Sequence, residues 1–333
     1  MKSAKFLGQD KIIVEDTPMP QPGAGEVLLK TSYCGICGSD KRLFHNGAKV
    51  TPGHELTGVV VENGAGANVP VGTRAAIYIH KYCGACKFCR AGETNRCLNG
   101  GGLVGWQTAG GYAEYLLAPA SSIIPLPDDI SAAEGVLLLD TIGTAAYGIR
   151  KCVEAANSRV RSADAAVIGC GPLGLGSLLV LLGMGWKNVH VFDPAESRLQ
   201  TAVAFGGKRL DPSLPASESR FSIVVEASGS QPGRMTCLNL VEAGGAVLFL
   251  GESDVPTTVQ ETPKLRRKDC NYLRTFYFPI NQAQENMQLL RACRPQYRQM
   301  IADVVPLEGL EQAFTDFIAG KTLKPLVKPN IES

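Results

Sequence analysis

Four cysteines lie close together in the first third of the chain, at Cys83, Cys86, Cys89 and Cys97. Thiolates at this spacing can surround one zinc ion tetrahedrally, and a site made of four thiolates has no open position for a substrate. Disulfides or buried thiols are the alternative, which the tight spacing and the lack of a secretion signal disfavour. We therefore predict a structural zinc site in this loop.

The bulk composition restricts the class of protein. The chain has 333 residues, which suits two domains, and its formal net charge of +2 gives no reason to expect nucleic acid or an anionic membrane as a partner. Its most apolar stretch, 173–186, is far shorter than a membrane span. Eleven cysteines without a signal peptide indicate metal ligands and reduced thiols, so we expect a cytoplasmic protein.

Two kinds of pattern divide the chain. Residues 1–145 hold short apolar runs between Gly and Pro clusters, which is typical of a β-rich domain with long loops. From residue 165 onward strands alternate with helices, which predicts a parallel, doubly wound sheet. The expected strands are 165–169, 188–192, 222–226, 245–250 and 271–278, and the expected helices are 172–184, 195–205, 233–241, 281–292 and 307–318.

The predicted fold class is therefore α/β, with two domains. Residues 1–145 and 280–333 would form the β-rich domain, with the cysteine lobe at 80–100. Residues 146–279 would form an inserted nucleotide-binding domain.

A Gly-x-Gly-x-x-Gly run, formed by Gly169, Gly171 and Gly174, joins the first of these strands to its helix. In that context the first glycine permits a tight turn, the second lets the backbone approach a pyrophosphate, and the third lets the helix pack on the strand. The helix N-terminus, at Pro172 and Leu173, supplies N–H groups for phosphates. An ordinary strand–turn–helix connection is the alternative.

Asp193 ends the next strand, at the place where dinucleotide-binding proteins carry an acid. Its carboxylate would accept hydrogen bonds from the adenosine-ribose hydroxyls and repel a 2′-phosphate, so we expect NAD rather than NADP. Arg198, one helical turn later, would lie on the adenine side. Ser228 is a further predicted cofactor contact.

A second set of metal-binding side chains lies in the β-rich domain. Cys37 stands in the run Cys-Gly-Ile-Cys-Gly-Ser-Asp at 34–40, and His54 stands in Gly-His-Glu at 53–55. A thiolate and an imidazole suit zinc, although either residue alone is more often part of a core or simply hydrogen-bonded.

These motifs, with the cysteine lobe and the nucleotide fold, resemble the zinc-dependent alcohol dehydrogenases of the medium-chain dehydrogenase/reductase family. Within it the chain looks most like the polyol, sugar and threonine dehydrogenase branch. The runs 110–115, 124–127 and 319–324 match as well.

The resemblance implies a GroES-like catalytic domain and a Rossmann domain, with the active site in the cleft between them. It makes Cys37, His54 and Asp140 ligands of a catalytic zinc, and Glu55 matches an acid that can act as a fourth ligand or exchange with water. Two zinc ions per chain are therefore expected. Zinc would polarise the substrate hydroxyl, and the resulting alkoxide would expel hydride onto the nicotinamide. Ser39 matches the hydroxyl that starts the family's proton relay.

One position departs from the family. Many relatives carry a relay histidine where this chain has Arg42, which stays protonated and is a poor base. The relay would then use His45, solvent or the substrate's own hydroxyls, and a surface histidine without a relay role is the alternative for His45. Lys324 matches a residue that reaches the cofactor pyrophosphate in some relatives, with a solvated lysine as the alternative. Cys34 matches no ligand position, and the basic run 264–268 is interpreted as a solvated face.

The expected activity is that of an NAD- and zinc-dependent dehydrogenase acting on a secondary hydroxyl of a polyol, sugar or amino alcohol. Ile79, His80, Trp106 and Gln107 fall near the loops that contact substrate in relatives, and a loop residue with no substrate role is the favoured alternative for each of them. The alternatives are a simple alcohol or aldehyde reductase, and a relative that binds nucleotide without zinc or dehydrogenase activity. The expected partners are a small-molecule alcohol and further copies of the chain, as a homodimer or homotetramer, with no nucleic acid and no membrane.

Overall fold

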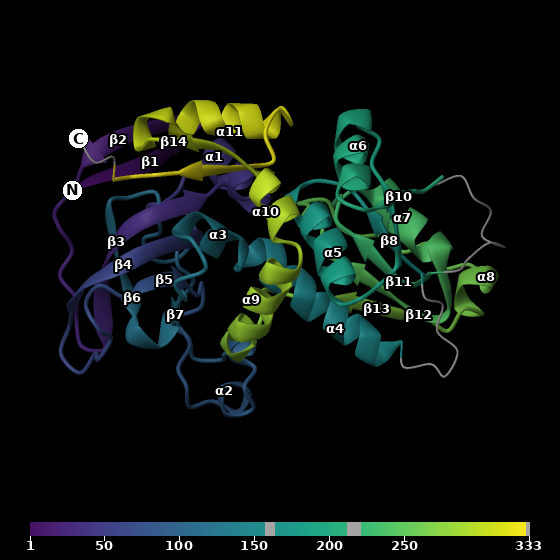
Figure 1. The fold of residues 1–333 in the computed structure, drawn as a ribbon, viewed down its shortest axis with the longest axis horizontal. Helices are drawn as coiled ribbons and strands as arrows, with labels where there is room; N and C mark the ends of the chain where they lie inside the picture. Colours follow the sequence, from purple (N-terminus) through teal and green to yellow (C-terminus); the bar gives the residue numbers. More distant parts are fainter. Residues whose placement is uncertain (157–163, 212–220, 331–333) are drawn as a thin grey trace. The chain divides into compact units, whose positions relative to one another are not determined.

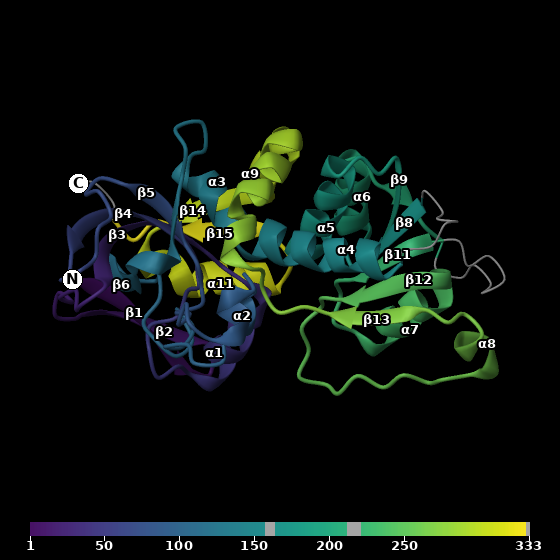
Figure 2. The ribbon, with the colours of Figure 1, turned by 90° about the horizontal axis from the view of Figure 1, so that it is seen from below.

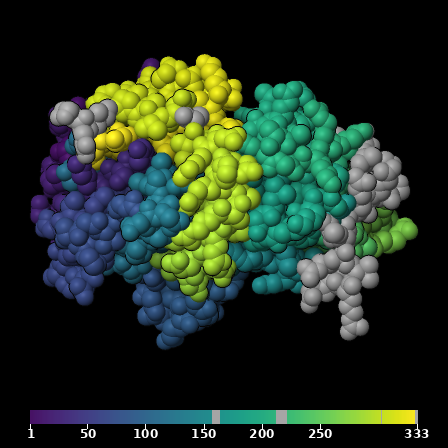
Figure 3. Space-filling model, viewed as in Figure 1, coloured from purple at the N-terminus to yellow at the C-terminus, as the bar shows by residue number. Residues whose placement is uncertain are grey.

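A computed structural model describes residues 1–156, 164–211 and 221–330 of the chain. It divides into two compact units. Unit 1 comprises Met1–Leu139, Pro279–Ala283 and Arg298–Ser333, and unit 2 comprises Asp140–Phe278 and Gln284–Tyr297. Both ends of the sequence therefore fold into unit 1, where Figure 3 shows yellow C-terminal atoms beside purple N-terminal atoms. The predicted α/β class is confirmed.

Unit 1 is built on a seven-stranded sheet with the order β14-β15-β3-β4-β5-β7, in which β6 also pairs with β3 (Figure 1). β14 and β15 pair in parallel, whereas β3 pairs antiparallel with β4, β6 and β15. Its strands are β3 (Glu26–Gly35), β4 (Glu55–Asn63), β5 (Arg74–Ile77), β6 (Tyr115–Pro119), β7 (Ile123–Pro125), β14 (Ile301–Val305) and β15 (Lys324–Val327). A separate hairpin is formed by β1 (Lys2–Gly8) and β2 (Lys11–Asp16).

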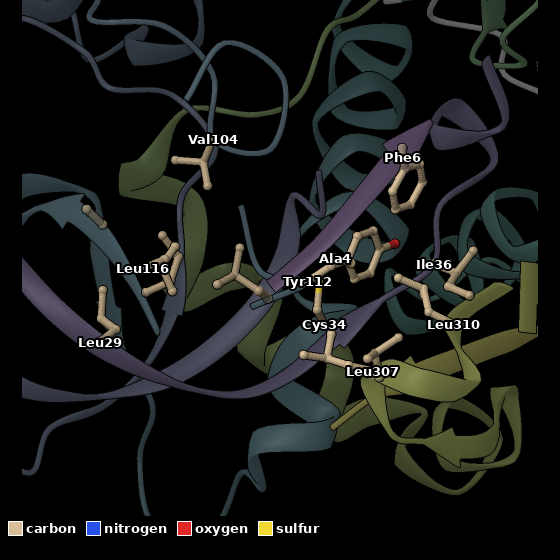
Figure 4. Close-up of a cluster of buried hydrophobic side chains, with 14 of the residues drawn as sticks. Ala4, Phe6, Leu29, Cys34, Ile36, Val104, Tyr112, Leu116, Leu307 and Leu310 are labelled. Atoms are coloured by element: carbon tan, nitrogen blue, oxygen red, sulfur yellow. The ribbon is translucent and has the colours of Figure 1, made fainter. Parts of the chain in front are cut away.

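The core of unit 1 draws on distant parts of the sequence (Figure 4). The ring of Phe6 from β1 stacks on Tyr112 with centroids 5.8 Å apart, and it meets the edge of Phe314 at 5.3 Å. Burying each aromatic side chain contributes roughly 1.5–3 kcal/mol. The N-terminal hairpin and the C-terminal tail are therefore held to the same apolar cluster, which also contains Cys34.

Short helices connect the strands of unit 1. The helices are α1 (Lys41–Asn46), α2 (Lys87–Arg90), α3 (Ala132–Leu137) and α11 (Leu310–Ile318), with 3₁₀ turns at Gly38–Asp40, Thr94–Arg96, Ala120–Ser122, Ile280–Gln282 and Leu307–Gly309. α3 begins with a capping box, in which Ser131 accepts from the N–H of Glu134 and the Glu134 carboxylate accepts from the N–H of Ser131.

Unit 2 contains a six-stranded parallel sheet with the order β10-β9-β8-β11-β12-β13. Its strands are β8 (Asp164–Ile168), β9 (Asn188–Phe192), β10 (Lys208–Arg209), β11 (Phe221–Glu226), β12 (Val241–Phe249) and β13 (Asn271–Arg274). Its helices are α4 (Ala145–Ala155), α5 (Pro172–Gly183), α6 (Glu196–Ala204), α7 (Gln231–Leu240) and α8 (Pro263–Arg266). α9 (Ala283–Ala292) and α10 (Arg294–Met300) follow, with residues divided between the two units.

The sheet of unit 2 is covered on both faces. Figure 2 shows α4 and α5 on one side of it and α7 on the other. The strand order reverses between β8 and β11, so a crevice is expected at the carboxyl ends of these two strands. The doubly wound sheet predicted from the sequence is confirmed.

Two expectations for unit 2 need correction. β13 ends at Arg274, whereas the sequence predicted a strand through residue 278, and Tyr277 instead has a positive φ of 56°. Lys268 was expected on a solvated face, but it is buried. Its ammonium donates hydrogen bonds to the carbonyls of Leu238, Asn239 and Val241 at 3.0, 2.6 and 2.8 Å, which compensate for the loss of water. It thereby satisfies the carbonyls at the C-terminal end of α7.

No helix in residues 1–156, 164–211 and 221–330 is long and apolar enough to cross a membrane.

Candidate metal centres and cofactor site

The four cysteines of the lobe come together at one point. The sulfur atoms of Cys83, Cys86, Cys89 and Cys97 all lie within 4.8 Å of one another. The N–H of Cys83 donates to the Cys97 sulfur at 3.2 Å, and the N–H of Cys86 donates to the Cys83 sulfur at 3.3 Å. The lobe therefore folds around its sulfur atoms, with α2 starting directly after Cys86.

The negative charge of four clustered thiolates would have to be balanced by a cation. Backbone N–H groups, first that of Leu98 and then that of Cys89, lower the pKa of the Cys86 thiol to about 6. Burial and the neighbouring Cys86 thiol raise the pKa of Cys89 to about 12. Four thiolates can coexist here only when a cation stands between them, and zinc is the ion that sulfur ligands in this arrangement prefer. The donor set thus fits a closed zinc site.

The hydroxyl group of Thr94 is one of the contacts between the lobe and the rest of unit 1. The oxygen of Thr94 lies 3.0 Å from the hydroxyl of Tyr78 and accepts from the N–H of Ile280, also at 3.0 Å. Because Thr94 sits between Cys89 and Cys97, the sulfur cluster holds this hydroxyl in place. The lobe consequently anchors the 3₁₀ turn Ile280–Gln282 that leads into α9.

A second group of ligands lies at the end of β3 and the start of β4. Cys37, His54, Glu55 and Asp140 offer one sulfur, one nitrogen and two carboxylates, with ligand atoms all within 4.8 Å of one another. Asp140 directly follows Leu139, the last residue of the first segment of unit 1, and opens a π-helical turn. The hydroxyl of Thr144 donates to its Oδ1 at 2.5 Å.

This donor set also fits zinc. Sulfur, imidazole nitrogen and carboxylate oxygen are the three ligand types that zinc accepts, and a site with three firm protein ligands keeps a position for substrate or water. The structure brings together the four residues that the sequence analysis proposed for a catalytic metal. Their roles as ligands remain our prediction.

Backbone geometry places His54 in this group. Gly53, the residue before it, has a φ of +101°, and a Cβ built on it would lie 2.7 Å from the sulfur of Cys34. Only glycine fits this turn without strain. Cys34 is fully buried in the core cluster, where burial raises the pKa of its thiol well above the usual range, so it is a packing residue as expected.

A buried carboxylate that the sequence analysis did not assign contacts His54 through its ring nitrogen Nδ1. Asp40 is 0% exposed, and its Oδ1 lies 3.1 Å from Nδ1 of His54. Its other oxygen accepts from the hydroxyl of Tyr112 at 3.1 Å. A carboxylate behind a metal-binding histidine fixes the ring tautomer and orientation.

Two groups approach the same nitrogen of His54. The indole N–H of Trp106 lies 3.3 Å from Nδ1, slightly farther than the Asp40 oxygen. We place the imidazole proton on Nδ1, facing Asp40, because a carboxylate needs a donor and the other ring nitrogen must be unprotonated to bind a metal. Trp106 is then a packing neighbour of the ring, with ring centroids 5.9 Å apart.

Glu55 forms a buried ion pair. Its Oε1 accepts from the ammonium of Lys324 at 2.5 Å, and the same ammonium donates to the carbonyl of Ile36 at 3.2 Å. Lys324 is 1% exposed and Glu55 is 0% exposed. The expected contact between Lys324 and a cofactor pyrophosphate is not supported by this placement, because the ammonium points at Glu55 inside unit 1. Lys324 instead supplies positive charge beside the ligand group.

The residues proposed for the proton relay lie in different places. The hydroxyl of Ser39 donates to the sulfur of Cys37 at 3.3 Å, so it borders the ligand group. Nδ1 of His45 is hydrogen-bonded to Oδ1 of Asp10 in the turn between β1 and β2, and the His45 ring is half exposed. The structure therefore brings Ser39 to the candidate metal centre and directs His45 to the hairpin. Arg42 stacks on Trp106, with its guanidinium carbon 4.7 Å from the ring centroid.

The other residues expected near the substrate differ in exposure, with Gln107 exposed and Trp106 half-buried. Ile79 and His80 are buried within unit 1, and burial lowers the pKa of His80 to about 4. The side-chain oxygen of Gln107 accepts from the N–H of Leu103 at 2.9 Å and so closes its own loop. Among these four, Trp106 is the residue that contacts the ligand group.

The glycine run of unit 2 has the geometry of a phosphate-binding loop. Gly169 has a φ of +97°, and Gly174 approaches it so closely that an added Cβ would lie 1.8 Å from the Gly169 carbonyl oxygen. A Cβ on Gly171 would meet nothing within 4 Å, which leaves open space beside the first turn of α5. Because Pro172 begins α5 and Gly171 caps it, the N–H groups of this turn are available to an anion.

Asp193 lies beside this loop. Its Oδ2 accepts from the N–H of Cys170 at 2.7 Å, and its Oδ1 accepts from the N–H of Ala195 at 2.9 Å. A carboxylate has about four lone-pair sites, so two remain for ribose hydroxyls. Arg198 is half-buried in α6 behind it.

A second buried carboxylate organises the neighbouring turn after β11. Glu226 is 0% exposed, and its Oε1 accepts from the N–H of Ser228 and that of Gly229, each at 2.8 Å. The Ser228 hydroxyl also donates to it, at 2.5 Å. Glu226 was not predicted from the sequence, because a carboxylate ending a buried strand gives no signal of the turn it holds.

Comparison with known proteins identifies the family of the chain. Residues 23–128 match the alcohol dehydrogenase GroES-like domain. An L-threonine 3-dehydrogenase of Legionella pneumophila (strain Corby) is 32% identical over 79% of this chain and 79% of its own length. The zinc-type alcohol dehydrogenase-like protein YphC of Escherichia coli (strain K12) is 29% identical over 76% of this chain and 77% of its own.

A solved structure gives the same result for the whole fold. The alcohol dehydrogenase TADH from Thermus sp. ATN1 superposes with a TM-score of 0.88 at 25% identity, covering 99% of this chain and 100% of its own. The chain belongs to the zinc-dependent alcohol dehydrogenases of the medium-chain dehydrogenase/reductase family. It is an oxidoreductase that uses zinc and a nicotinamide cofactor and acts on a small-molecule alcohol.

Proposed function

We propose that this enzyme transfers hydride between NAD and a secondary alcohol or its ketone, with a polyol, sugar or amino alcohol as substrate. The observation that carries the proposal is the group of Cys37, His54, Glu55 and Asp140, with ligand atoms within 4.8 Å of one another. Zinc bound there would act as a Lewis acid on the substrate oxygen, and a bound nicotinamide would accept or return the hydride.

The protein's own residues would hold and balance this centre. Cys37, His54 and Asp140 would be the ligands, and Asp40 would keep the His54 ring oriented through Nδ1. Glu55 would serve as the exchangeable fourth ligand, held by the ammonium of Lys324. Cys83, Cys86, Cys89 and Cys97 would bind the second, structural zinc.

The substrate's proton would leave through Ser39. Its hydroxyl borders the sulfur of Cys37, so it is positioned to take a proton from a substrate hydroxyl at the metal. His45 is paired with Asp10, and arginine side chains are poor bases, so the next acceptor would be solvent, the cofactor ribose or a second substrate hydroxyl. This proposal predicts a relay that does not depend on an imidazole.

The cofactor would bind to unit 2 through its glycine loop. Gly169, Gly171 and Gly174, with Pro172 and Leu173, would surround the pyrophosphate, and Ser228 would border the site. Asp193 would bind the adenosine ribose and so favour NAD over NADP, with Arg198 nearby. Substituting Asp193→Ala should lower kcat/KM with NAD by about tenfold or more, as expected for losing hydrogen bonds to a charged group. Unchanged use of NAD would contradict the assignment.

The preferred substrate class can be tested directly. Polyols, sugars, amino alcohols and simple alcohols are offered with NAD, and reduced nicotinamide is followed by its absorbance. Zinc per chain is measured on the same preparation. Two zinc ions with turnover of a polyol, sugar or amino alcohol support the proposal. One zinc, confined to the cysteine lobe, would exclude it.

The assembly and location of the enzyme complete the proposal. We expect a homodimer or homotetramer in the cytoplasm, with unit 1 acting as the catalytic domain and unit 2 as the cofactor domain. Mass measurement of the native protein distinguishes the two assemblies.

A further inference from the structure

Glu226, the last residue of β11, joins two loops at the carboxyl end of the sheet in unit 2. Its carboxylate oxygen Oε1 accepts from the N–H groups of Ser228 and Gly229, each at 2.8 Å, and from the Ser228 hydroxyl. Its backbone carbonyl accepts from the N–H groups of Leu250 and Gly251, at 2.8 and 2.9 Å. Donors from the loops after β11 and β12 therefore converge on one residue, which is 0% exposed.

The two loops pack together without room for a side chain between them. A Cβ built on Gly251 would lie 2.0 Å from the backbone nitrogen of Gly229, and Gly229 has a φ of +70°. Another residue would be strained at Gly229, and no side chain fits at Gly251 unless the backbone shifts. The turn 227–230 is therefore held between Gly251 on one side and the Glu226 carboxylate on the other.

The same turn also packs against the glycine loop after β8. A Cβ built on Gly169 would lie 2.7 Å from the Ser228 nitrogen and 2.9 Å from the carbonyl carbon of Ala227. The N–H of Ala227 donates to the carbonyl of Ile168 at 2.8 Å. Because the strand order reverses between β8 and β11, the crevice for a dinucleotide is expected between these two turns. A shift of the turn 227–230 would therefore move one wall of the cofactor site.

A chain of hydrogen bonds extends this arrangement into α7. The Ser228 hydroxyl gives its hydrogen to the Glu226 carboxylate, so Ser230 must be the donor where the two hydroxyl oxygens lie 2.9 Å apart. The Ser230 oxygen in turn accepts from the N–H of Gly233 in the first turn of α7, at 3.1 Å. The carboxylate thus fixes the direction of both hydroxyl groups as well as the path of the backbone.

We propose that Glu226 is a positioning residue for the nicotinamide cofactor. It acts without touching the cofactor, because its carboxylate holds the turn 227–230 in the shape against which the glycine loop packs. This inference rests on the proposed cofactor site in unit 2 and adds to it a residue on which the geometry of that site depends. The acceptor oxygen must reach the turn, whereas the negative charge of the acceptor matters less.

Two substitutions separate reach from charge. Glu226→Gln keeps the length of the side chain and one oxygen for the three donors. Its amide nitrogen takes the place of Oε2, which has no hydrogen-bond partner in the part of the chain that the structure describes. Glu226→Asp keeps the charge but withdraws the oxygens by one methylene group, so the N–H groups of Ser228 and Gly229 lose their acceptor.

Cofactor affinity is the quantity to compare. The Kd of NADH, and separately that of NADPH, is measured by fluorescence titration, and the more tightly bound dinucleotide is used for all variants. Glu226→Asp should raise this Kd by at least about tenfold, the effect of leaving buried donors unsatisfied, whereas Glu226→Gln should raise it by less than about threefold. Equal increases in both variants, or no increase in Glu226→Asp, would overturn the inference.

Asp164 provides a matched control. It begins β8 at the amino end of the same sheet, where its Oδ1 accepts from the side chain of Asn188 at 2.7 Å. Asp164→Ala therefore removes a carboxylate from unit 2 without disturbing the two turns, and the Kd for the cofactor should equal that of the wild type. A Kd raised as much as in Glu226→Asp would show that any loss of stability in unit 2 weakens binding, and the inference would fall.

Hydrogen exchange in the wild-type enzyme gives an answer that needs no variant. The amides of Ser228 and Gly229 exchange only when they leave the carboxylate, so a cofactor bound at this crevice should slow their exchange. Adding the more tightly bound dinucleotide should protect both the turn 227–230 and the glycine loop 169–174. Protection of the glycine loop alone would contradict the inference, even if Glu226→Asp does not fold.

The two proposals fail in different ways. If the wild type has two zinc ions and oxidises alcohols, while Glu226→Asp binds the cofactor as tightly as the wild type, the proposed function stands and the Glu226 inference falls. If no alcohol is oxidised but Glu226→Asp weakens cofactor binding and Glu226→Gln does not, the Glu226 inference stands and the proposed function falls.

Discussion

The cysteine lobe and the buried group around His54 both gather four metal-binding side chains, but their surroundings are opposite. The lobe lies in a loop near the surface, where Cys83 is exposed and the contacts among the four residues are largely with one another. The His54 group adjoins a dense core and is flanked by two further buried charges, Asp40 and Lys324.

The difference separates two uses of one ion. In the lobe, a cation would supply most of the stability of a segment that has little apolar core of its own. Around His54, the core already holds the ligands in place. A cation there would therefore not be needed for folding and could act on the substrate. The same metal can thus be required for folding in the lobe and for catalysis at the His54 group.

The largest expected effect is on catalysis at the buried group. Cys37→Ser should lower kcat/KM by at least about 10³-fold, because Lewis-acid stabilisation is worth several kcal/mol and each 1.36 kcal/mol is a factor of about ten. Zinc should fall from two ions per chain to one. Cys34→Ala is the matched control, since that thiol is buried nearby without being in the ligand group. Full activity with two zinc ions in Cys37→Ser would contradict our assignment.

The next effect is on stability at the lobe. Cys86→Ser should lower Tm by about 5–10 °C, the size expected when a domain of this length loses a few kcal/mol. The zinc lost should be the one in the lobe, and kcat per folded molecule should stay close to that of the wild type. Loss of hydride transfer at an unchanged Tm would mean that the roles of the two centres are reversed.

A smaller effect tests the carboxylate behind His54. Asp40→Asn should weaken zinc binding at the buried group by about 10–100-fold, the usual cost of losing such a partner. Competition with a chelator measures it, and zinc in the lobe is the internal reference. Tyr112→Phe removes one hydrogen bond to Asp40 and should weaken zinc binding by about tenfold or less. Equal zinc release from both variants and the wild type would rule out this role.

The smallest effect concerns pH at the lobe. Backbone N–H groups hold the pKa of Cys86 at about 6, below its ordinary value of 9.0, so its thiolate is retained above that pH and lost as the pH falls through about 6. Protons then compete with the metal, so zinc in the lobe should become easier to extract below about pH 6. Zinc release to a chelator at pH 8, 7, 6 and 5 measures the trend. A constant release rate would contradict it.

The strands of unit 2 were predictable because each is a short buried run of small and β-branched residues. Asn188–Phe192 was predicted with the bounds that the structure gives, and Ser222–Glu226 is one residue shorter than β11. The metal-binding and glycine motifs were also visible, since their function fixes both residue type and spacing. Local sequence patterns therefore suffice to predict strands and binding motifs whose residues are close together both in the sequence and in the fold.

Long-range pairings were not predictable in this way. Lys324 matched a known motif, yet its ammonium binds Glu55, which lies 269 residues earlier in the chain. Asp40 stands in the motif at 34–40, but its burial and its contact with His54 depend on two separate segments meeting in the fold. The basic run 264–268 gave no sign that Lys268 would turn inward onto α7.

Each unit contains one such inward-facing lysine, and this has a practical consequence. Lys324 in unit 1 and Lys268 in unit 2 are the lysines among the described buried residues, at 1% and 8% exposure. A water-soluble acylating reagent should modify the surface amines first and reach these two only when their own unit opens. Peptide mapping after timed acylation would therefore report the opening of each half of the enzyme separately, without any introduced label.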